Sequence, residues 1–315
     1  MAFDTLLGND RLKQNLAESL AKNHISHFYL ISGPRGSGKR TLAKLLAQAI
    51  LCKGHPKPCG TCEPCRKIQS GNHPDFITVE DPEHKNVAVK IVRAFREDVF
   101  IRPNESDYKI YLFPQDLGIE GQNALLKILE EPPKYGIFLL LTDNPEKILP
   151  TVRSRCRELK MQALSQETLQ TYLSARFPDT VREDVAAAAL RSGGFLGQAL
   201  ELLESGGTVP PQTENFITAV SSRNPLLLTQ TLVPMEKWKR DALADILQSW
   251  LELTEEALAA RSGRPALSPH ARTLSQSRTP AELLDISPCQ KKATAYTTSN
   301  VSPAAVCGWL VWQLR

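Results

Sequence analysis

The segment GPRGSGKRT places Gly33, Gly38 and Lys39 at the spacing G-x4-G-K. In a glycine-rich turn of this kind the backbone N–H groups point inward around phosphate groups, and the lysine reaches the β- and γ-phosphates of a nucleotide. Such a cradle lies between a strand and a helix, and here an apolar run precedes Gly33 while a helical pattern follows Lys39. The segment therefore predicts a phosphate-binding loop and not a plain glycine-rich turn. Its predicted nucleotide-contacting residues are Gly33, Gly36, Ser37, Gly38, Lys39 and Thr41.

The residue after the lysine departs from this pattern. A Ser or Thr hydroxyl normally follows the lysine and holds Mg²⁺, but Arg40 stands at this position. Thr41 comes one residue later, and one residue along a helix is a rotation of about 100°. ATP or ADP could therefore bind to this loop, but the magnesium ligand that hydrolysis needs is absent from its usual place.

A second defect lies at the end of the strand predicted for YKIYLF. Hydrolysis needs carboxylates directly after such a strand, one to hold Mg²⁺ and one to orient the attacking water. The sequence has Pro114 and Gln115 at these positions, and Asp116 is offset by two. Proline cannot ligate a metal, and glutamine is a poor proton acceptor. Because two separate motifs are defective, we expect no nucleotide hydrolysis by this chain on its own.

Four of the seven cysteines lie in the segment CKGHPKPCGTCEPC, with the spacing C-x6-C-x2-C-x2-C. Thiolates spaced in this way can surround a tetrahedral Zn²⁺ at about 2.3 Å each, and four sulfurs leave no open position, so a structural zinc site is predicted. An iron–sulfur cluster and four unligated thiols are the alternatives. His55 and His73 are near in sequence and could substitute, but a full set of cysteines makes them unnecessary. The predicted ligands are Cys52, Cys59, Cys62 and Cys65.

Strand and helix patterns alternate in the first half of the chain. Short apolar runs predict strands at 27–32, 75–80, 108–113, 136–142 and 156–161. Apolar residues at helical spacing, such as Leu12, Leu16 and Leu20, predict helices before and between them. This alternation is typical of a parallel sheet that is covered on both faces. We therefore expect an α/β domain at 1–162, with the cysteine segment 52–65 inserted in it.

The strand patterns stop beyond about Ser165. Helical runs predict a small helical domain at 163–207, with Ser165 as the N-cap of its first helix. The segment GGTVPPQTEN is interpreted as a linker into a second helical domain, 208–315, which includes a long amphipathic pattern from Glu236 to about Arg261. The following segment RSGRPALSPHARTLSQSRTP, which includes residues 263–280, is poor in large apolar residues and predicts a mobile loop.

Composition excludes some classes of protein. A length of 315 residues allows two or three domains with cores of their own. Lys plus Arg 38 against Asp plus Glu 34 gives a formal net charge of +4, too slight to indicate a nucleic-acid binder by itself. No signal-peptide pattern opens the sequence, and no apolar run approaches the ~18 residues of a membrane span. We expect a soluble, cytoplasmic protein without membrane contact, a setting in which disulfides are rare.

The order of the motifs is similar to that of a known family. The segments HFYLISGPRGSGK, CGTCEPC, SGNHPDF, NALLKILEEPP and SRC follow one another here, and this order resembles that of bacterial DNA polymerase III clamp loaders. Among them the chain resembles the delta-prime subunit family, through specific motifs over residues 1 to about 205 and more weakly to the C-terminus. Clamp loaders are AAA+ proteins with a P-loop α/β domain, a helical lid and a helical collar that holds a ring of five subunits. The resemblance therefore implies the AAA+ fold and matches the three expected domains.

The resemblance also implies a function and partners. Clamp loaders open a ring-shaped sliding clamp and place it on primed DNA. The implied partners are the gamma/tau and delta subunits of the ring, the clamp and, through the complex, primer–template DNA. In this family the delta-prime subunit is similar to the motor subunits but lacks their working ATP site. The lid arginine that senses nucleotide in the motors would fall at Gly197, so a third element of the ATP site is missing.

Two other functional readings compete with this one. The chain could be an ATPase motor of the same ring, which the residues at positions 114, 115 and 197 disfavour. It could also be a zinc-bearing nucleic-acid-binding module unrelated to replication. That reading is disfavoured because no basic, aromatic-studded recognition helix accompanies the cysteines.

Arg155 in the segment TVRSRCREL has two interpretations. In clamp loaders the Ser-Arg-Cys motif presents its arginine to the γ-phosphate bound by the neighbouring subunit, so the resemblance implies a trans arginine finger, worth about 10³–10⁵ in rate. The alternative is an arginine near a helix C-terminus, where the dipole favours a cation by about 0.3–1 kcal/mol. Arg153, Arg157 and Lys160 stand close by, which is compatible with a simple basic cluster.

Glu130 and Glu131 stand at the predicted end of a helix that Pro132 and Pro133 terminate. The helix dipole disfavours anions at this end by a few tenths of a kcal/mol, about the lower bound of its usual effect. We therefore expect basic partners from the same domain or from an adjacent subunit. The sequence assigns these glutamates no catalytic role.

Overall fold

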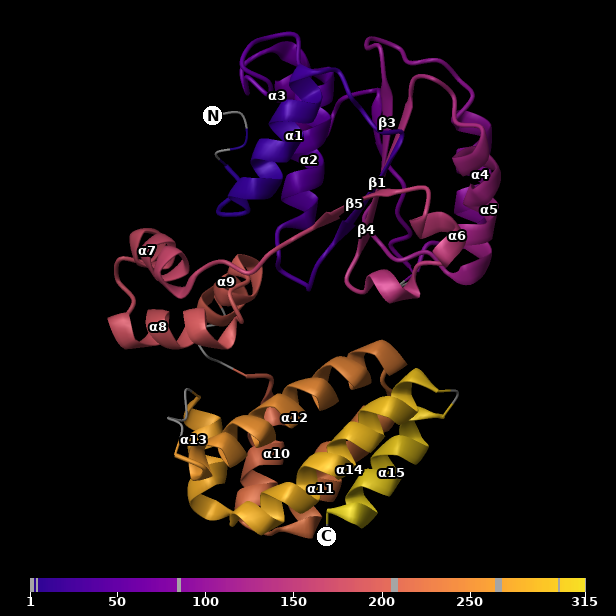
Figure 1. Cartoon of the computed structure of the whole chain (residues 1–315). Coiled ribbons are helices and arrows are strands. Elements are labelled where there is room, and N and C mark those ends of the chain that lie inside the picture. Colours follow the sequence, from indigo (N-terminus) through magenta and orange to yellow (C-terminus); the bar gives the residue numbers. More distant parts are fainter. Residues whose placement is uncertain are drawn as a thin grey trace. The chain divides into compact units, whose positions relative to one another are not determined.

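The computed structural model describes Phe3 and residues 5–83, 86–204, 209–263, 268–299 and 301–314. These residues form two compact units, Met1–Glu201 and Leu202–Arg315, which we call the first and the second unit. Figure 1 shows a sheet with helices in the first unit and helices in the second. The predicted boundaries at residues 162 and 207 stay predictions, and residue 207 lies outside the described residues.

The described part of the first unit contains one sheet of five parallel strands, in the order β2-β3-β4-β1-β5. The strands are β1 (Phe28–Ser32), β2 (Phe76–Thr78), β3 (Lys109–Phe113), β4 (Gly136–Thr142) and β5 (Arg157–Lys160). Each strand lies within a predicted strand segment. The predicted parallel α/β architecture is therefore confirmed.

Helices cover both faces of this sheet (Figure 1). On one face lie α1 (Asp10–Ala21), α2 (Lys39–Leu51) and α3 (Glu63–Ser70), and on the other α4 (Val89–Asp98), α5 (Ile119–Glu130) and α6 (Pro150–Arg153), which follows the 3-10 turn η1 (Pro145–Lys147). Side chains alternate along β1, so Tyr29 and Ile31 pack with α1 and α2 while Phe28 and Leu30 pack with α4 and α5. Because both faces are covered, the strand reads as a continuous apolar run.

The first unit continues into the short helices predicted after residue 165. They are α7 (Gln166–Arg176), α8 (Arg182–Arg191) and α9 (Leu196–Glu204). The Ser165 hydroxyl accepts a hydrogen bond from the Thr168 backbone N–H, which confirms the predicted N-cap. Leu169 and Leu173 of α7 are buried, so this helix contributes its apolar face to a small core.

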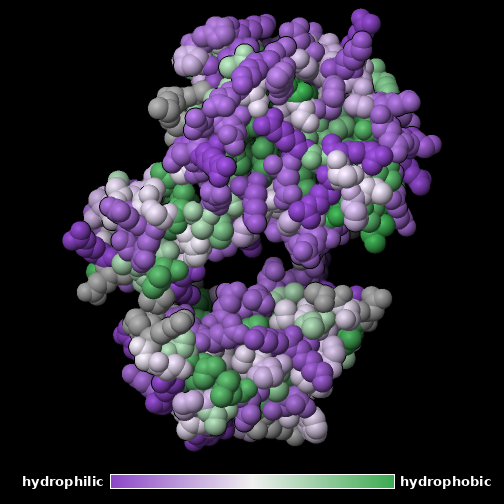
Figure 2. Space-filling view, viewed as in Figure 1, coloured by the Kyte–Doolittle hydropathy of each residue, from purple (hydrophilic) through white to green (hydrophobic). Residues whose placement is uncertain are grey.

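The described part of the second unit is helical. Its elements are α10 (Pro211–Ser221), α11 (Pro225–Leu232), η2 (Val233–Lys237), α12 (Arg240–Arg261), α13 (Pro269–Ser277), α14 (Pro280–Thr298) and α15 (Pro303–Gln313). Phe216 and Trp250 stack with ring centroids 4.0 Å apart, and the Trp250 indole N–H donates to the Thr213 hydroxyl at 2.9 Å. Hydrophobic residues also reach the surface of this unit between hydrophilic ones (Figure 2), and its exposed large side chains include Leu226 and Trp312.

Two predictions about this unit are wrong. The predicted mobile loop contains helix α13, because the Ser268 hydroxyl caps it and because Ala271 and Leu274 are buried in the core. Its polar composition concealed the few apolar residues that anchor it. The predicted linker likewise ends early, since α10 begins at Pro211, a residue type suited to a first helical turn. The residues 264–267 of the predicted loop lie outside the described residues.

The long amphipathic pattern predicted from Glu236 divides into two elements. The 3-10 turn η2 ends at Lys237, and the helix α12 begins only at Arg240. No helix in the described ranges is both long enough and apolar enough to cross a membrane.

Candidate nucleotide site and metal centre

The predicted phosphate-binding loop leaves the carboxyl end of β1, which lies between β4 and β5 in the sheet. Parallel α/β sheets usually bind ligands in the crevice at this end of their strands. A cavity of about 440 Å³ opens here, a volume typical of small-molecule sites. Its lining includes Gly36, Ser37, Gly38, Lys39 and Thr41. Gly33, the remaining predicted residue, is not among the lining residues, but its carbonyl oxygen accepts a hydrogen bond from Lys39 Nζ at 2.6 Å.

The ammonium group of Lys39 has a full set of protein partners. It donates to the Gly33 and Pro34 carbonyl oxygens at 2.6 and 2.9 Å, and it pairs with Asp143 Oδ1 at 2.5 Å. Three acceptors match the three protons of an ammonium group. The Lys39 side chain is only 11% exposed, whereas that of Asp143 is 59% exposed, so water reaches the pair from the aspartate side. An entering phosphate must therefore displace Asp143 before it can bind this lysine.

Asp143 is the residue of this cavity that the motif analysis missed. Ser32 of β1 pairs with Thr142 of β4, so the first residues after these two strands lie side by side. Asp143 directly follows β4 and lines the cavity that the phosphate loop forms. The available signal was a polar residue at the end of a buried apolar strand. Only the strand order places it beside Lys39, which is 104 residues away in the sequence.

The residues that replace the usual magnesium ligands are used elsewhere. Arg40 Nη2 pairs with Glu80 Oε2 at 3.3 Å, and both side chains are exposed, which makes the pair worth roughly 0–1 kcal/mol. Thr41 is exposed and lines the cavity.

The hydroxyl of Ser37 is buried and has no hydrogen-bond partner among the described residues. A buried hydroxyl without a partner is unusual and is compatible with a ligand at this loop.

The end of β3 supplies no free carboxylate pair to the cavity. Pro114 lines it. The side-chain amide of Gln115 is bound to the Asp81 backbone, donating to its carbonyl at 2.8 Å and accepting from its N–H at 2.7 Å. Asp116 Oδ1 accepts from the Thr142 hydroxyl at 2.9 Å. The residues at this strand end thus serve the structure of the neighbouring loops.

Helix α9 touches the phosphate loop through two glycines. The Gly197 backbone N–H donates to the Gly36 carbonyl at 2.8 Å, and the Gln198 side-chain amide donates to the Arg35 carbonyl at 2.9 Å. A Cβ atom on Gly197 would lie 2.6 Å from Gly36 Cα, closer than real contacts of this kind. Gly36 has a φ of +74°, which glycine adopts without strain. The position at which an arginine was predicted to be missing is therefore one with no room for any side chain.

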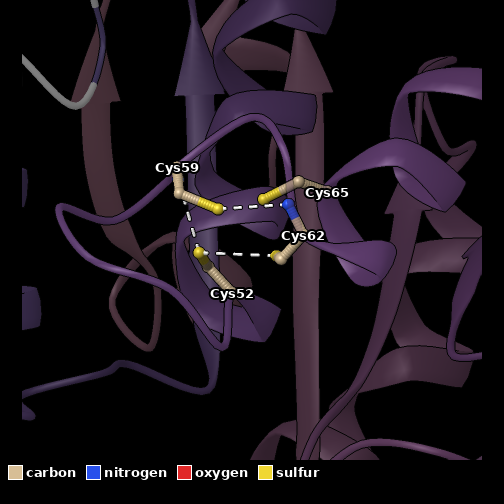
Figure 3. Close-up of side chains that lie close together, drawn as sticks. All are labelled: Cys52, Cys59, Cys62 and Cys65. Atoms are coloured by element: carbon tan, nitrogen blue, oxygen red, sulfur yellow. Dashed lines mark hydrogen bonds between the residues drawn. The ribbon is translucent and has the colours of Figure 1, made fainter.

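The four predicted cysteine ligands gather at the junction of α2 and α3 (Figure 3). Their sulfur atoms all lie within 4.8 Å of one another, and the sulfurs of Cys52 and Cys62 are 3.8 Å apart. Tetrahedral Zn–S bonds of about 2.3 Å require sulfur–sulfur separations of about 3.8 Å. Cys52 follows the last residue of α2, and Cys62 and Cys65 stand at the start of α3. The arrangement fits a tetrahedral metal ion such as zinc.

Local hydrogen bonds prepare the cysteines for a metal. The backbone N–H of Cys62 donates to Cys59 Sγ, and this bond is the main cause that lowers the pKa of the Cys59 thiol to about 5. Burial raises the pKa of Cys65 and of Cys52. The buried thiols thus resist ionisation until a cation arrives, because a metal ion stabilises the thiolate. Metal binding at this cluster should therefore release protons.

His73 is not part of the cluster. Its ring is buried, with Nδ1 accepting from the Asp75 backbone N–H at 3.0 Å and Nε2 lying 3.5 Å from the Ser106 hydroxyl. The carboxylate of Asp75 accepts hydrogen bonds from the backbone N–H groups of 104, 105 and 106. This network ties the loop before β3 to the region after α3. Lys67 of α3 adds an ion pair with Glu105 at 2.6 Å.

Arg155 lies far from the phosphate loop of its own chain. It precedes β5, whereas the loop follows β1, and in a parallel sheet these are opposite ends of the strands. Met161, whose N–H donates to the Ser32 carbonyl, stands six residues beyond Arg155. Only the part from Arg157 onward is extended, and from there to Met161 the chain rises roughly 13 Å at about 3.3 Å per residue, with Arg155 two residues further back. Arg155 therefore cannot contact a nucleotide in the cavity of its own subunit.

Comparison with known proteins agrees with these features. The family model described as DNA polymerase III, delta subunit, matches residues 8–165, half of the chain. The tau subunit of DNA polymerase III from Bacillus subtilis is 36% identical over 171 residues, which are 53% of this chain and 30% of that protein. The delta' subunit from the same organism is 35% identical over 166 residues, 52% of this chain and 50% of that protein. The chain thus spans at most half the length of these relatives.

One solved structure that aligns with this chain is described as a DNA polymerase III gamma subunit-related protein from Thermotoga maritima. It aligns with a TM-score of 0.46 and 16% identity over 96% of this chain and 99% of the other. The family match covers the sheet, the phosphate loop, the cysteine cluster and the Ser-Arg-Cys segment. The chain therefore belongs to the DNA polymerase III delta subunit family, a family of clamp-loader subunits of the AAA+ type.

Proposed function

We propose that this chain is the non-hydrolysing delta-prime subunit of a bacterial clamp loader. In this role it joins gamma/tau and delta subunits in a five-subunit ring that loads a sliding clamp onto primer–template DNA. It contributes through contacts with its neighbours and through Arg155, which serves as an arginine finger for the ATP site of an adjacent subunit. The observation that carries the proposal is the position of Arg155 at the amino-terminal ends of the parallel strands, opposite to the phosphate loop at their carboxyl ends.

The state of the phosphate loop supports the absence of hydrolysis by this chain. Lys39 is engaged by Asp143, and no carboxylate pair follows β3 in the described cavity lining. Arg40 occupies the position at which a Ser or Thr hydroxyl would ligate Mg²⁺. ATP or ADP can occupy a cavity of this size without turnover, with the backbone N–H groups of the loop as donors.

The cysteine cluster supports a structural Zn²⁺ as the resident metal. Cys52, Cys59, Cys62 and Cys65 supply four sulfurs within 4.8 Å of one another, and four protein ligands on a tetrahedral ion would leave no position for a substrate. When bound, zinc would cross-link the end of α2 to the start of α3. The metal thus supports local order and takes no part in the chemistry of nucleotides.

The second unit is proposed to be the collar that holds the ring. Its described exposed side chains include Leu226, Leu284 and Trp312, which are 66%, 57% and 68% exposed. Large apolar side chains at a surface of helices are suited to contacts with other subunits.

An active ATPase motor of the gamma/tau type is the second candidate. The retained phosphate loop favours it, because Gly38 and Lys39 line a cavity large enough for a nucleotide. The Bacillus subtilis tau and delta' subunits are similar to this chain at 36% and 35% identity, so identity does not separate the two roles.

Measurement of ATP turnover separates these candidates. The isolated chain is expected to hydrolyse ATP no faster than background, whereas turnover that Lys39→Ala abolishes would establish the motor. In a ring reconstituted with ATP-hydrolysing partner subunits, Arg155→Ala should lower turnover because one site loses its finger. Arg153→Ala is the control, since Arg153 is a nearby cation that pairs with Glu158 at 3.0 Å. Equal losses from both variants would mean that the arginines act only as a basic patch.

A further inference from the structure

Helix α5 ends with a negative charge at its negative end. Glu130 is its last residue and Glu131 its C-cap, and the helix dipole makes this position unfavourable for carboxylates. Both side chains are exposed, so neither is held there by packing. Lys127, three residues earlier on α5, makes no ion pair with Glu130 among the described contacts, so the described partner of this carboxylate lies on another element.

The guanidinium of Arg155 supplies this partner. Arg155 Nη2 lies 3.6 Å from Glu130 Oε1, and Arg155 Nη1 donates a hydrogen bond to the Thr151 carbonyl oxygen at 2.9 Å. Thr151 belongs to the short helix α6, so the guanidinium lies between the carbonyl ends of α5 and α6. Two of its three nitrogen atoms are thereby oriented by two different elements. Glu131, the next residue, has no described hydrogen bond or ion pair of its side chain within the residues that the structure covers.

We propose that Glu130 is the positioning residue for Arg155 and directs the guanidinium outward toward the neighbouring subunit. This inference rests on the finger role proposed above. The fork of an arginine must be oriented before it meets a phosphate, because a guanidinium donates in fixed directions. The Thr151 carbonyl oxygen accepts a hydrogen bond from Nη1 and the Glu130 carboxylate attracts Nη2, which biases the orientation of the fork and leaves its remaining N–H groups for the phosphate.

The geometry also explains why the contact with Glu130 leaves the Arg155 guanidinium free to bind a phosphate. The Arg155 and Glu130 side chains are 41% and 58% exposed, and their 3.6 Å separation is too long for a strong hydrogen bond. Exposed pairs of this kind are weak, so a phosphate with more negative charge can engage the guanidinium without first overcoming a tight ion pair. The contact orients Arg155 and leaves it available.

The free chain provides a test that is independent of the ring. In ¹⁵N relaxation of the Arg155 side chain, Glu130→Gln should increase the motion of Nε, because one of two anchors is lost. Glu131→Gln is the matched control, since it removes the same charge from the same helix end without touching Arg155. Unchanged motion in Glu130→Gln would overturn the positioning role, whatever the ring assay reports.

In the reconstituted ring, Glu130→Gln should lower kcat for ATP by roughly two- to fivefold and leave KM unchanged, because the finger acts in the transition state. In the Arg155→Ala background the same change should have no further effect, whereas a structural role would persist there. An increase in kcat, or an equal loss with Glu131→Gln, would overturn the proposal. If Arg155→Ala itself has no effect, the finger role fails, and the relaxation measurement still reports whether Glu130 orients Arg155.

Discussion

Gly197→Ala is the substitution that most directly tests the contact between helix α9 and the phosphate loop. The new Cβ would lie 2.6 Å from Gly36 Cα and 2.9 Å from the Gly36 carbonyl oxygen, and both atoms belong to the backbone. Neither can move away as the end of a flexible side chain could. The helix must therefore retreat from the loop.

The size of the effect follows from these distances. Ordinary contacts of a Cβ begin at 3.4 Å, so the helix must move by about 0.8 Å. The hydrogen bond from the Gly197 N–H to the Gly36 carbonyl, now 2.8 Å long, would then lengthen beyond hydrogen-bonding range. Loss of one such bond costs about 0.5–1.5 kcal/mol. Since 1.4 kcal/mol corresponds to a factor of ten, the Gly197 amide should exchange its hydrogen about two- to tenfold faster.

Hydrogen exchange resolved at the Gly197 amide is the appropriate assay, because its described partner is the Gly36 carbonyl alone. The midpoint of global thermal unfolding should change little, because the lost contact is local. Gly308→Ala is the matched control, since nothing lies within 4 Å of a Cβ at that helical position. Unaltered exchange at Gly197 in the alanine variant would show that the two glycines do not hold the helix against the loop.

Two further predictions concern the metal and the second unit. The chain is expected to bind one Zn²⁺. Metal analysis of the double variant Cys62→Ala and Cys65→Ala should find less than half an equivalent of zinc, with loss of order around α3 and without global unfolding. Zinc retained by this variant would contradict the four-sulfur site. A hydrogen bond from the Thr279 N–H, with help from Arg223 and Arg278, lowers the pKa of Glu282 from 4.5 to about 2. Because this pKa is lowered by folding, the stabilisation is present above about pH 4.5 and is lost as the pH falls toward 2. Glu282→Gln should therefore lower the melting temperature at pH 7 but not near pH 2, whereas Glu214→Gln, an exposed carboxylate of α10, should change neither; an equal loss at both pH values would refute the assignment.

Local patterns in the sequence determined the strands, the phosphate loop and the cysteine cluster. Each depends on residues that are near one another in the chain. The strand β1 could be predicted from its apolar run because both of its faces are buried. The cysteines form a cluster because they lie within one loop and one helical turn. The same local reasoning failed for α13, where the buried apolar residues Ala271 and Leu274 anchor a segment of polar composition.

The tertiary structure decided which distant residues meet at the candidate sites. Lys39 meets Asp143 because β1 and β4 are paired in register, and Gly36 meets Gly197 because α9 returns to the phosphate loop. Glu130 meets Arg155 because α5 and α6 end at the same edge of the sheet. No spacing rule predicts such contacts, because they depend on strand order and on the direction in which parallel strands run. The sequence therefore determines which chemical groups are present, whereas the tertiary fold determines which of them come into contact.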